Sequence, residues 1–244
     1  MNILITVCAR GGSKGVPNKN IKNIKGKPLI YYSLDLIKEL KKEKVFENSD
    51  VVLSSDSDKI KRIVSVYENL KINLDYERPE YLATDESGKL DVIIDVKNFM
   101  SSKNEKVYDY VLDLDVTSPL RTSEDILLAF DKLQKNKDAS NIFSVNLANK
   151  NPYFNMVEEN KRGFYSLCKN GEFLSRQKAP KVYEMNASFY IYRNSFFELN
   201  KKRVITENSL IFEMKHICFD IDHPIDFNFM EYLLENNKLD FIIK

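Results

Sequence analysis

Residues 8–20 read C-A-R-G-G-S-K-G-V-P-N-K-N and separate two apolar segments of the chain. The apolar run Ile3 to Val7 predicts a buried strand, and Leu29 to Leu40 has the apolar spacing typical of an amphipathic helix. Glycines let a loop backbone approach a ligand and turn its N–H groups inward, and cations among such groups suit a polyphosphate. The glycines, hydroxyl and cations here are Gly11, Gly12, Gly15, Ser13, Arg10, Lys14 and Lys19. The stretch therefore predicts a strand–loop–helix unit that binds phosphates; a Gly-rich connection with solvated lysines is the alternative.

This Gly-rich loop lacks the two common phosphate motifs. No glycine starts the Walker pattern, and the adjacent Gly11 and Gly12 break the dinucleotide pattern G-x-G-x-x-G. The sequence instead matches R-x-x-S-x-G-x-x-x-K-N, which resembles the signature loop of the CMP-sialic acid synthetases, the acylneuraminate cytidylyltransferases. The resemblance implies that the loop wraps the triphosphate and base of CTP. By it, the catalytic residues are Arg10, Lys14 and Lys19, and the nucleotide-binding residues are Ala9, Gly11, Gly12, Ser13 and Asn20.

Composition limits the classes of partner. The net charge of +1 in 244 residues gives no overall attraction to nucleic acid or to an anionic membrane. Three scattered cysteines fit a reducing compartment, and no apolar run approaches the ~18 residues of a membrane span. Met1 is followed at once by a predicted strand, so we expect no signal peptide and a cytoplasmic protein.

Strand and helix patterns alternate along the chain. Further strands are predicted at 50–54, 72–77, 108–114, 141–146 and 188–192, and further helices after 55–58, through 90–99, and at 123–134 and 225–234. Such alternation predicts a three-layer, Rossmann-like α/β fold with a mainly parallel sheet. The polar cluster at 55–58 is either a helix N-cap or part of the site, because ligands collect at the carboxyl ends of parallel strands.

Two later stretches resemble further family motifs. Residues 78–85 read R-P-E-Y-L-A-T-D, and the resemblance implies that Arg78 lies near the nucleotide base; a plain loop is the alternative. After Asp85, the small hydroxyl residues expected in the family are partly replaced, as E-S-G-K.

The second stretch, residues 115–121, reads D-V-T-S-P-L-R where the family has Q-P-T-S-P-L-R. The resemblance implies that Asp115 and Ser118 bind the sugar acid; a loop entering a helix is the alternative. An ionised carboxylate only accepts hydrogen bonds, so a lone charge at Asp115 predicts a preference for legionaminic acid over N-acetylneuraminate. The alternative is that a nearby cation, such as Arg176, neutralises this charge, so that the sugar preference of the sialic-acid family is kept.

Residues 147–183 lack long periodic helices. In the family this region is a protruding subdomain, inserted in a single cytidylyltransferase domain, that packs against a second chain and closes its site. The resemblance therefore implies a homodimer, with Arg176 and Asn186 as sugar contacts; a surface arginine is the alternative for Arg176.

Asp220 and Asp222 are two positions apart, so on an extended segment both carboxylates point the same way. The family has D-x-D here, and hard oxygen ligands suit Mg²⁺ or Mn²⁺. Capping of the helix at 225–234 is the alternative for both. His216 and His223 have no partner pattern for nucleophilic catalysis, and we interpret both as structural.

The resemblance covers nearly the whole chain and implies a cytidylyltransferase. A hydroxyl of a nine-carbon α-keto sugar acid, of sialic or legionaminic type, attacks the α-phosphate of CTP, and pyrophosphate leaves. No residue pattern identifies the general base. Two alternatives remain: a nucleotidyltransferase for another acceptor, such as a 3-deoxy-octulosonate or a sugar phosphate, and a non-catalytic nucleotide-binding module.

Overall fold

The computed structural model describes residues 1–12, 15–84, 86–198 and 203–243. Its contacts divide the chain into two compact units. The first comprises Met1–Ser144 and Asn186–Lys244, and the second comprises Val145–Met185. Among the described residues, no helix is both long enough and apolar enough to cross a bilayer.

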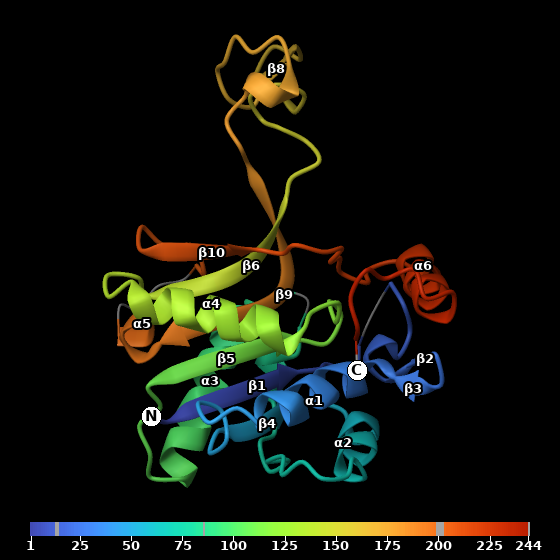
Figure 1. The fold of residues 1–244 in the computed structure, drawn as a ribbon, viewed down its shortest axis with the longest axis vertical. Coiled ribbons are helices and arrows are strands. Elements are labelled where there is room, and N and C mark those ends of the chain that lie inside the picture. Colours follow the sequence, from blue (N-terminus) through green and yellow to red (C-terminus); the bar gives the residue numbers. More distant parts are fainter. Residues whose placement is uncertain (13–14, 85, 199–202, 244) are drawn as a thin grey trace. The chain divides into compact units, whose positions relative to one another are not determined.

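A six-stranded sheet in the order β10-β6-β9-β5-β1-β4 forms the centre of the first unit (Figure 1). Its strands are β1 (Ile3–Cys8), β4 (Asp50–Ser54), β5 (Tyr110–Asp115), β6 (Asn141–Leu147), β9 (Tyr183–Arg193) and β10 (Ser209–Glu213). Strand β1 pairs in parallel with both β4 and β5, while β9 is antiparallel to β5. The predicted α/β fold with a mainly parallel sheet is therefore confirmed.

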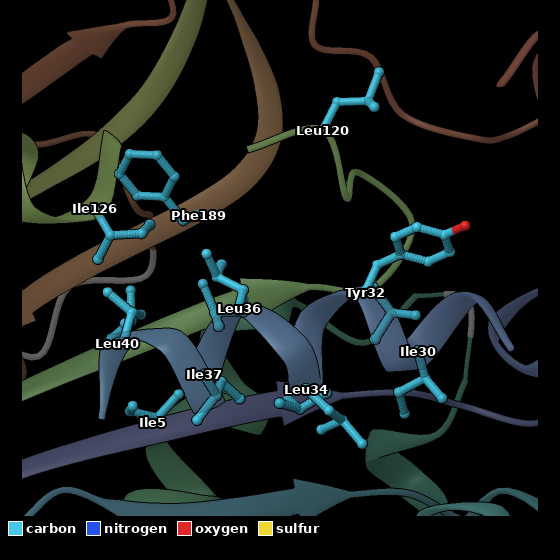
Figure 2. Packing of buried hydrophobic residues seen from close by; sticks show 14 of the residues in the cluster. Ile5, Ile30, Tyr32, Leu34, Leu36, Ile37, Leu40, Leu120, Ile126 and Phe189 are labelled. Carbon is cyan, nitrogen blue, oxygen red and sulfur yellow. The ribbon is translucent and has the colours of Figure 1, made fainter. Parts of the chain in front are cut away.

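Helices cover both faces of this sheet. The helices of the described chain are α1 (Leu29–Leu40), α2 (Asp58–Ser65), α3 (Lys89–Lys103), α4 (Ser123–Lys135), α5 (Asn194–Glu198) and α6 (Pro224–Glu235), of which α6 contacts β2. Side chains of a strand alternate between faces, and Ile3, Ile5 and Val7 of β1 belong to one buried cluster with α1 and α4. Figure 2 shows this packing around Ile5, Ile37 and Ile126. Helix α3 contacts β1 and β4, and its buried residues lie outside that cluster, on the other face.

One predicted strand is wrong. Residues 72–77 form no strand, only isolated bridges from Asn73 to Val52 and from Glu77 to Ser55. The side chain of Asn73 accepts a hydrogen bond from the backbone N–H of Asp75 at 3.1 Å. Such a local bond turns the chain away from a ladder, so pairing ends after one residue. Strand β5 begins two residues later than predicted, and β9 is longer at both ends.

The remaining short elements are β2 (Asn23–Ile24), β3 (Lys27–Pro28) and the 3₁₀ turns Lys19–Ile21, Glu80–Leu82 and Arg176–Lys178. The second unit contains an antiparallel pair, β7 (Val157–Glu159) and β8 (Tyr165–Leu167). Several of its large apolar side chains are exposed, including Phe164, Tyr165 and Leu174.

Candidate active site

A cavity of about 360 Å³ lies in the first unit where β1 and β5 end. Its lining comes from several segments: Cys8, Arg10, Gly15, Lys19, Asn20, Arg78, Leu82, Thr84, Ser87, Lys89, Val92, Asp115, Thr117 and Asp222. The carboxyl edge of a parallel sheet is the usual place for a ligand in such folds. The cavity is the candidate active site, and it brings together the Gly-rich loop, the segment around Arg78, Asp115 and Asp222.

The Gly-rich loop is held in place by polar contacts. Asn20 Nδ2 donates to the main-chain oxygen of Arg10 at 2.9 Å, and the N–H of Gly11 donates to Asp56 Oδ1 at 2.8 Å. The cluster at 55–58 therefore fixes the loop as well as preceding α2. Ala9 is fully buried and donates to the oxygen of Ser54. Ser13 and Lys14 lie outside the described residues.

Two glycines of this loop lie close to neighbouring segments, and the contact at Gly15 excludes a side chain. A Cβ at Gly15 would lie 2.1 Å from the main-chain oxygen of Asp222, and one at Gly11 would lie 3.0 Å from the Cβ of Ser57. A Cβ at Gly12 would meet nothing within 4 Å. Gly15 therefore lets the loop approach the carboxylate segment at 220–222.

Lys19 bridges these two segments. Its Nζ donates to the main-chain oxygen of Ile221 and lies 3.2 Å from Asp222 Oδ1. The side chain of Lys19 is 12% exposed, whereas that of Asp222 is 65% exposed. A phosphate in the cavity would thus meet a cation already oriented by the protein.

Asp220 and Asp222 are not the residues that cap α6. Asp226 Oδ2 accepts the backbone N–H groups of Asp222 and His223, at 3.0 and 2.7 Å. Asp220 Oδ1 is buried and has no hydrogen-bond partner among the described residues. Burial, followed by the negative charge of Asp115, raises the pKa of Asp220. A buried carboxylate oxygen without a hydrogen-bond partner suits a divalent cation. In the described part of the chain, no group of three or more acidic, histidine or cysteine side chains is arranged to hold a metal ion.

Arg78 is fixed at the end of β4. Its Nε and Nη2 donate to Ser54 Oγ and to the Ser54 main-chain oxygen, both at 3.0 Å. Thr84 and Ser87 line the cavity beside it, with their hydroxyl oxygens 2.7 Å apart. The segment therefore supplies small hydroxyls to the cavity despite its departure from the family pattern.

Asp115 does not carry the lone charge that its substitution for glutamine predicts. Lys89 Nζ lies 2.6 Å from Asp115 Oδ2 and 3.0 Å from Asp113 Oδ2. Although burial opposes ionisation, Lys89 and Thr117 lower the pKa of Asp115 to about 2. Lys89 thus neutralises Asp115 within the first unit. Arg176 belongs to the second unit, where it donates to the main-chain oxygen of Ala148. Sequence reasoning missed Lys89; its one signal was a cation in the first turn of a helix, where the helix dipole disfavours positive charge.

Ser118 and Asn186 lie in a buried network and are not among the residues that line the described cavity. Ser118 Oγ donates to the main-chain oxygen of Asn186 at 2.7 Å, and Ser144 Oγ donates to Asn186 Oδ1 at 2.6 Å. Both side chains therefore join buried hydrogen bonds between strands and loops, and their contact with a sugar acid stays a prediction.

Arg121, at the end of the matched motif, joins the same buried network. Its Nη1 donates to the main-chain oxygens of Asp115, Ser118 and Ser188, at 2.8, 2.6 and 2.8 Å. Burial lowers the pKa of this guanidinium to about 10. These bonds fix the backbone between residues 115 and 121. Arg121 therefore holds the main chain that carries Asp115 at the cavity wall.

Comparison with known proteins agrees with this geometry. The chain is 37% identical over 238 residues to the "Post-translational flagellin modification protein B" of Campylobacter coli. It is 38% identical over 239 residues to the "CMP-N,N'-diacetyllegionaminic acid synthase" of Campylobacter jejuni. Each alignment covers 97% of this chain and 97% of the relative.

Among solved structures, the fold is similar to a CMP:2-keto-3-deoxy-manno-octonic acid synthetase complexed with CTP. The TM-score is 0.68 at 14% identity, covering 97% of this chain and 100% of the other. A family model described as "Cytidylyltransferase" matches residues 4–243. The chain therefore belongs to the cytidylyltransferase family.

Proposed function

We propose that the protein transfers CMP from CTP to a hydroxyl of a nine-carbon α-keto sugar acid and releases pyrophosphate. One observation carries the proposal: a single cavity at the sheet edge presents the cations of a Gly-rich loop, the exposed carboxylate Asp222, and the polar pair Lys89 and Asp115. Family membership supports the CTP half of the reaction. The names of two full-length relatives support the acceptor half: the diacetyllegionaminic acid synthase and a "Pseudaminic acid cytidylyltransferase" of C. jejuni, the latter 28% identical.

Phosphoryl transfer of this kind needs in-line placement and neutralised charge more than covalent help from the protein. Arg10 and Lys19 line the cavity and would hold the triphosphate and the departing pyrophosphate. The loop N–H group at Gly12 would add a donor, since that of Gly11 is held by Asp56. Lys14 and Ser13 are assigned the same role from the sequence alone. Arg78, beside Thr84 and Ser87, would face the base.

A divalent cation fits the carboxylate segment. Asp220 Oδ1, which is buried and has no hydrogen-bond partner in the described parts of the chain, and the exposed carboxylate of Asp222 are hard oxygen ligands, which suit Mg²⁺ or Mn²⁺. Mg²⁺ is commonly bound by one or two carboxylates together with substrate phosphates, which agrees with a site of only two protein ligands. Bound there, the cation would neutralise charge on the phosphate oxygens.

We further propose a homodimer formed through the second unit. Phe164, Tyr165 and Leu174 are 69%, 67% and 94% exposed within one chain. Several large apolar side chains exposed in one small unit favour a protein contact surface there. A closed dimer of identical chains is the commonest assembly that would bury them.

The experiment is pyrophosphate release from CTP and Mg²⁺ with four acceptors: N,N'-diacetyllegionaminate, pseudaminate, N-acetylneuraminate and 3-deoxy-manno-octulosonate. We expect release with one or more of the nonulosonates. We expect it to be fastest with the legionaminate because of the name of the 38% identical relative, since the ion pair with Lys89 removes the argument from a lone charge at Asp115. Release only with the octulosonate would transfer the proposal to the eight-carbon acids. Binding of CTP without release for any acceptor would instead indicate a nucleotide-binding module.

A further inference from the structure

Lys89 occupies a position that charge alone disfavours. It is the first residue of α3, and the N-terminus of a helix repels a cation. Two carboxylates compensate: Asp115 Oδ2 at 2.6 Å and Asp113 Oδ2 at 3.0 Å. The ring of Tyr190 also lies under the ammonium, with its centroid 4.7 Å away. The side chain is 27% exposed and lines the cavity, so this ion triad of Lys89, Asp113 and Asp115 forms part of the cavity wall.

The two carboxylates of the triad differ in access. Asp113 is fully buried, and its Oδ1 accepts hydrogen bonds from Thr6 Oγ1 at 2.6 Å and Cys8 Sγ at 3.6 Å. Asp115 is 21% exposed and lines the cavity. Asp113 therefore anchors the ammonium from inside, whereas Asp115 is the member that a ligand can reach.

The acceptor sites of Asp115 can be counted. A carboxylate offers about four lone-pair sites. Thr117 occupies two on Oδ1, through its backbone N–H at 3.0 Å and its hydroxyl at 2.8 Å. Lys89 occupies one on Oδ2 at 2.6 Å. Counting the described residues, one acceptor site on Oδ2 is left for a ligand, and Lys89 fixes its direction.

The charge of the triad limits what can bind there. One ammonium and two carboxylates sum to −1, and the carboxylate of Asp220 also acts on Asp115. An acidic group of the substrate would be repelled, whereas a neutral donor such as a hydroxyl or an amide N–H would be accepted.

We propose that Lys89 is a positioning residue for acceptor recognition: it holds the carboxylate of Asp115 so that one oxygen site accepts a hydrogen bond from a hydroxyl or amide N–H of the sugar acid. This inference rests on the proposed function, because it names a contact to the acceptor of that reaction. It assigns Lys89 no contact with CTP.

The experiment measures initial rates with N,N'-diacetyllegionaminate and with N-acetylneuraminate, varying the acceptor and CTP separately. Lys89→Met and Asp115→Asn should each raise the acceptor KM ~10-fold or more, the scale of one lost hydrogen bond to a charged group. The CTP KM should stay within about twofold of wild type. The double variant should be no worse than the poorer single variant, since residues that act as one unit are not additive.

Lys89→Arg serves as a second variant, because loss of the cation from between two carboxylates can prevent folding. Arginine keeps the charge, but its longer planar head cannot occupy the same position. We therefore expect a folded enzyme with a raised acceptor KM and an unchanged CTP KM. An unchanged acceptor KM in the folded variants would overturn the inference. So would effects of the two single variants that add in the double variant and raise the CTP KM as much as the acceptor KM. A wild-type enzyme that releases no pyrophosphate with any sugar acid would instead overturn the proposed function.

Discussion

Lys19 Nζ lies 3.2 Å from Asp222 Oδ1, although 203 positions separate the two residues along the chain. The pair joins the Gly-rich loop to the segment that would hold the divalent cation. The cation proposed to bind the phosphates and the carboxylate proposed to bind the metal are therefore positioned by one contact.

The first prediction concerns the metal. Asp220→Asn and Asp222→Asn should each abolish Mg²⁺-dependent turnover, because an amide is a neutral and weaker ligand for a hard cation. Pyrophosphate release is measured across a Mg²⁺ titration, and thermal unfolding checks that each variant is folded.

Asp226→Asn is the matched control. It lies on the same segment, but its carboxylate caps α6 instead of facing the cavity. We expect a loss of about 1 kcal/mol in the free energy of unfolding with the metal dependence retained. Wild-type metal dependence in both Asp220→Asn and Asp222→Asn would show that neither residue is a ligand.

The second prediction concerns the phosphates. Arg10→Ala should lower turnover ~10²-fold or more, the scale for loss of one preorganised charge-stabilising group. Lys22→Ala is the control, since Lys22 packs over the ring of Phe227 at 3.9 Å and is not among the cavity residues. Near-normal turnover of a folded Arg10→Ala protein would remove Arg10 from the reaction.

The loop and the sheet edge were predictable from the sequence because both are local patterns: a strand, glycines and cations, then a helix. Lys89 was not predictable, because its ion pair with Asp115 spans 26 positions and depends on α3 starting beside the end of β5. Ser118 belongs to a matched motif, yet its hydroxyl turns into a buried network. A motif fixes which residues are present, whereas packing decides which side chains reach the cavity.

The third prediction concerns pH. His216 Nε2 lies 2.9 Å from Asp125 Oδ2, and its ring stacks on Phe241 at 3.8 Å between centroids. Burial alone would lower the pKa of His216, but the hydrogen bond to Asp125 raises it above its usual value of 6.5. The stabilisation is therefore fully present below about pH 6.5 and is lost as pH rises through the raised pKa.

Asp125 sets the lower limit of the same window. Burial acts to raise the pKa of Asp125, but hydrogen bonds from His216 and Thr122 outweigh it and hold the pKa below the usual 3.8. The contribution of Asp125 to the free energy of unfolding is therefore lost as pH falls from 3.8 through that lowered pKa. The free energy of unfolding of wild type should thus decline as pH rises above about 6.5, and His216→Gln should flatten this slope. His223→Gln, which removes the only other histidine in the sequence, should leave the slope in place.

The fourth prediction concerns assembly. Phe164→Ser and Leu174→Ser should weaken the proposed dimer, because each removes an exposed apolar side chain of the second unit. Light scattering at high micromolar concentration gives the mass. Leu128→Ser is the control, since Leu128 is 52% exposed on α4 of the first unit. A wild-type monomer under these conditions would contradict the assembly.

The last prediction concerns Gly15. A methyl group there would lie 2.1 Å from the main-chain oxygen of Asp222, far inside van der Waals contact, and the partner is backbone that cannot rotate away. Gly15→Ala should therefore push the Gly-rich loop from the carboxylate segment, break the contact between Lys19 and Asp222, and lower both the unfolding temperature and turnover.

Gly12→Ala is the comparison for stability, because a methyl group at Gly12 meets nothing within 4 Å. Its unfolding temperature should stay close to that of wild type, whatever happens to CTP binding. If Gly15→Ala unfolded at the same temperature as Gly12→Ala and kept full turnover, the close approach of loop and carboxylate segment would not be needed for the site. A larger residue at position 15, such as valine, should extend the loss, since the same oxygen blocks every side chain that begins with a Cβ.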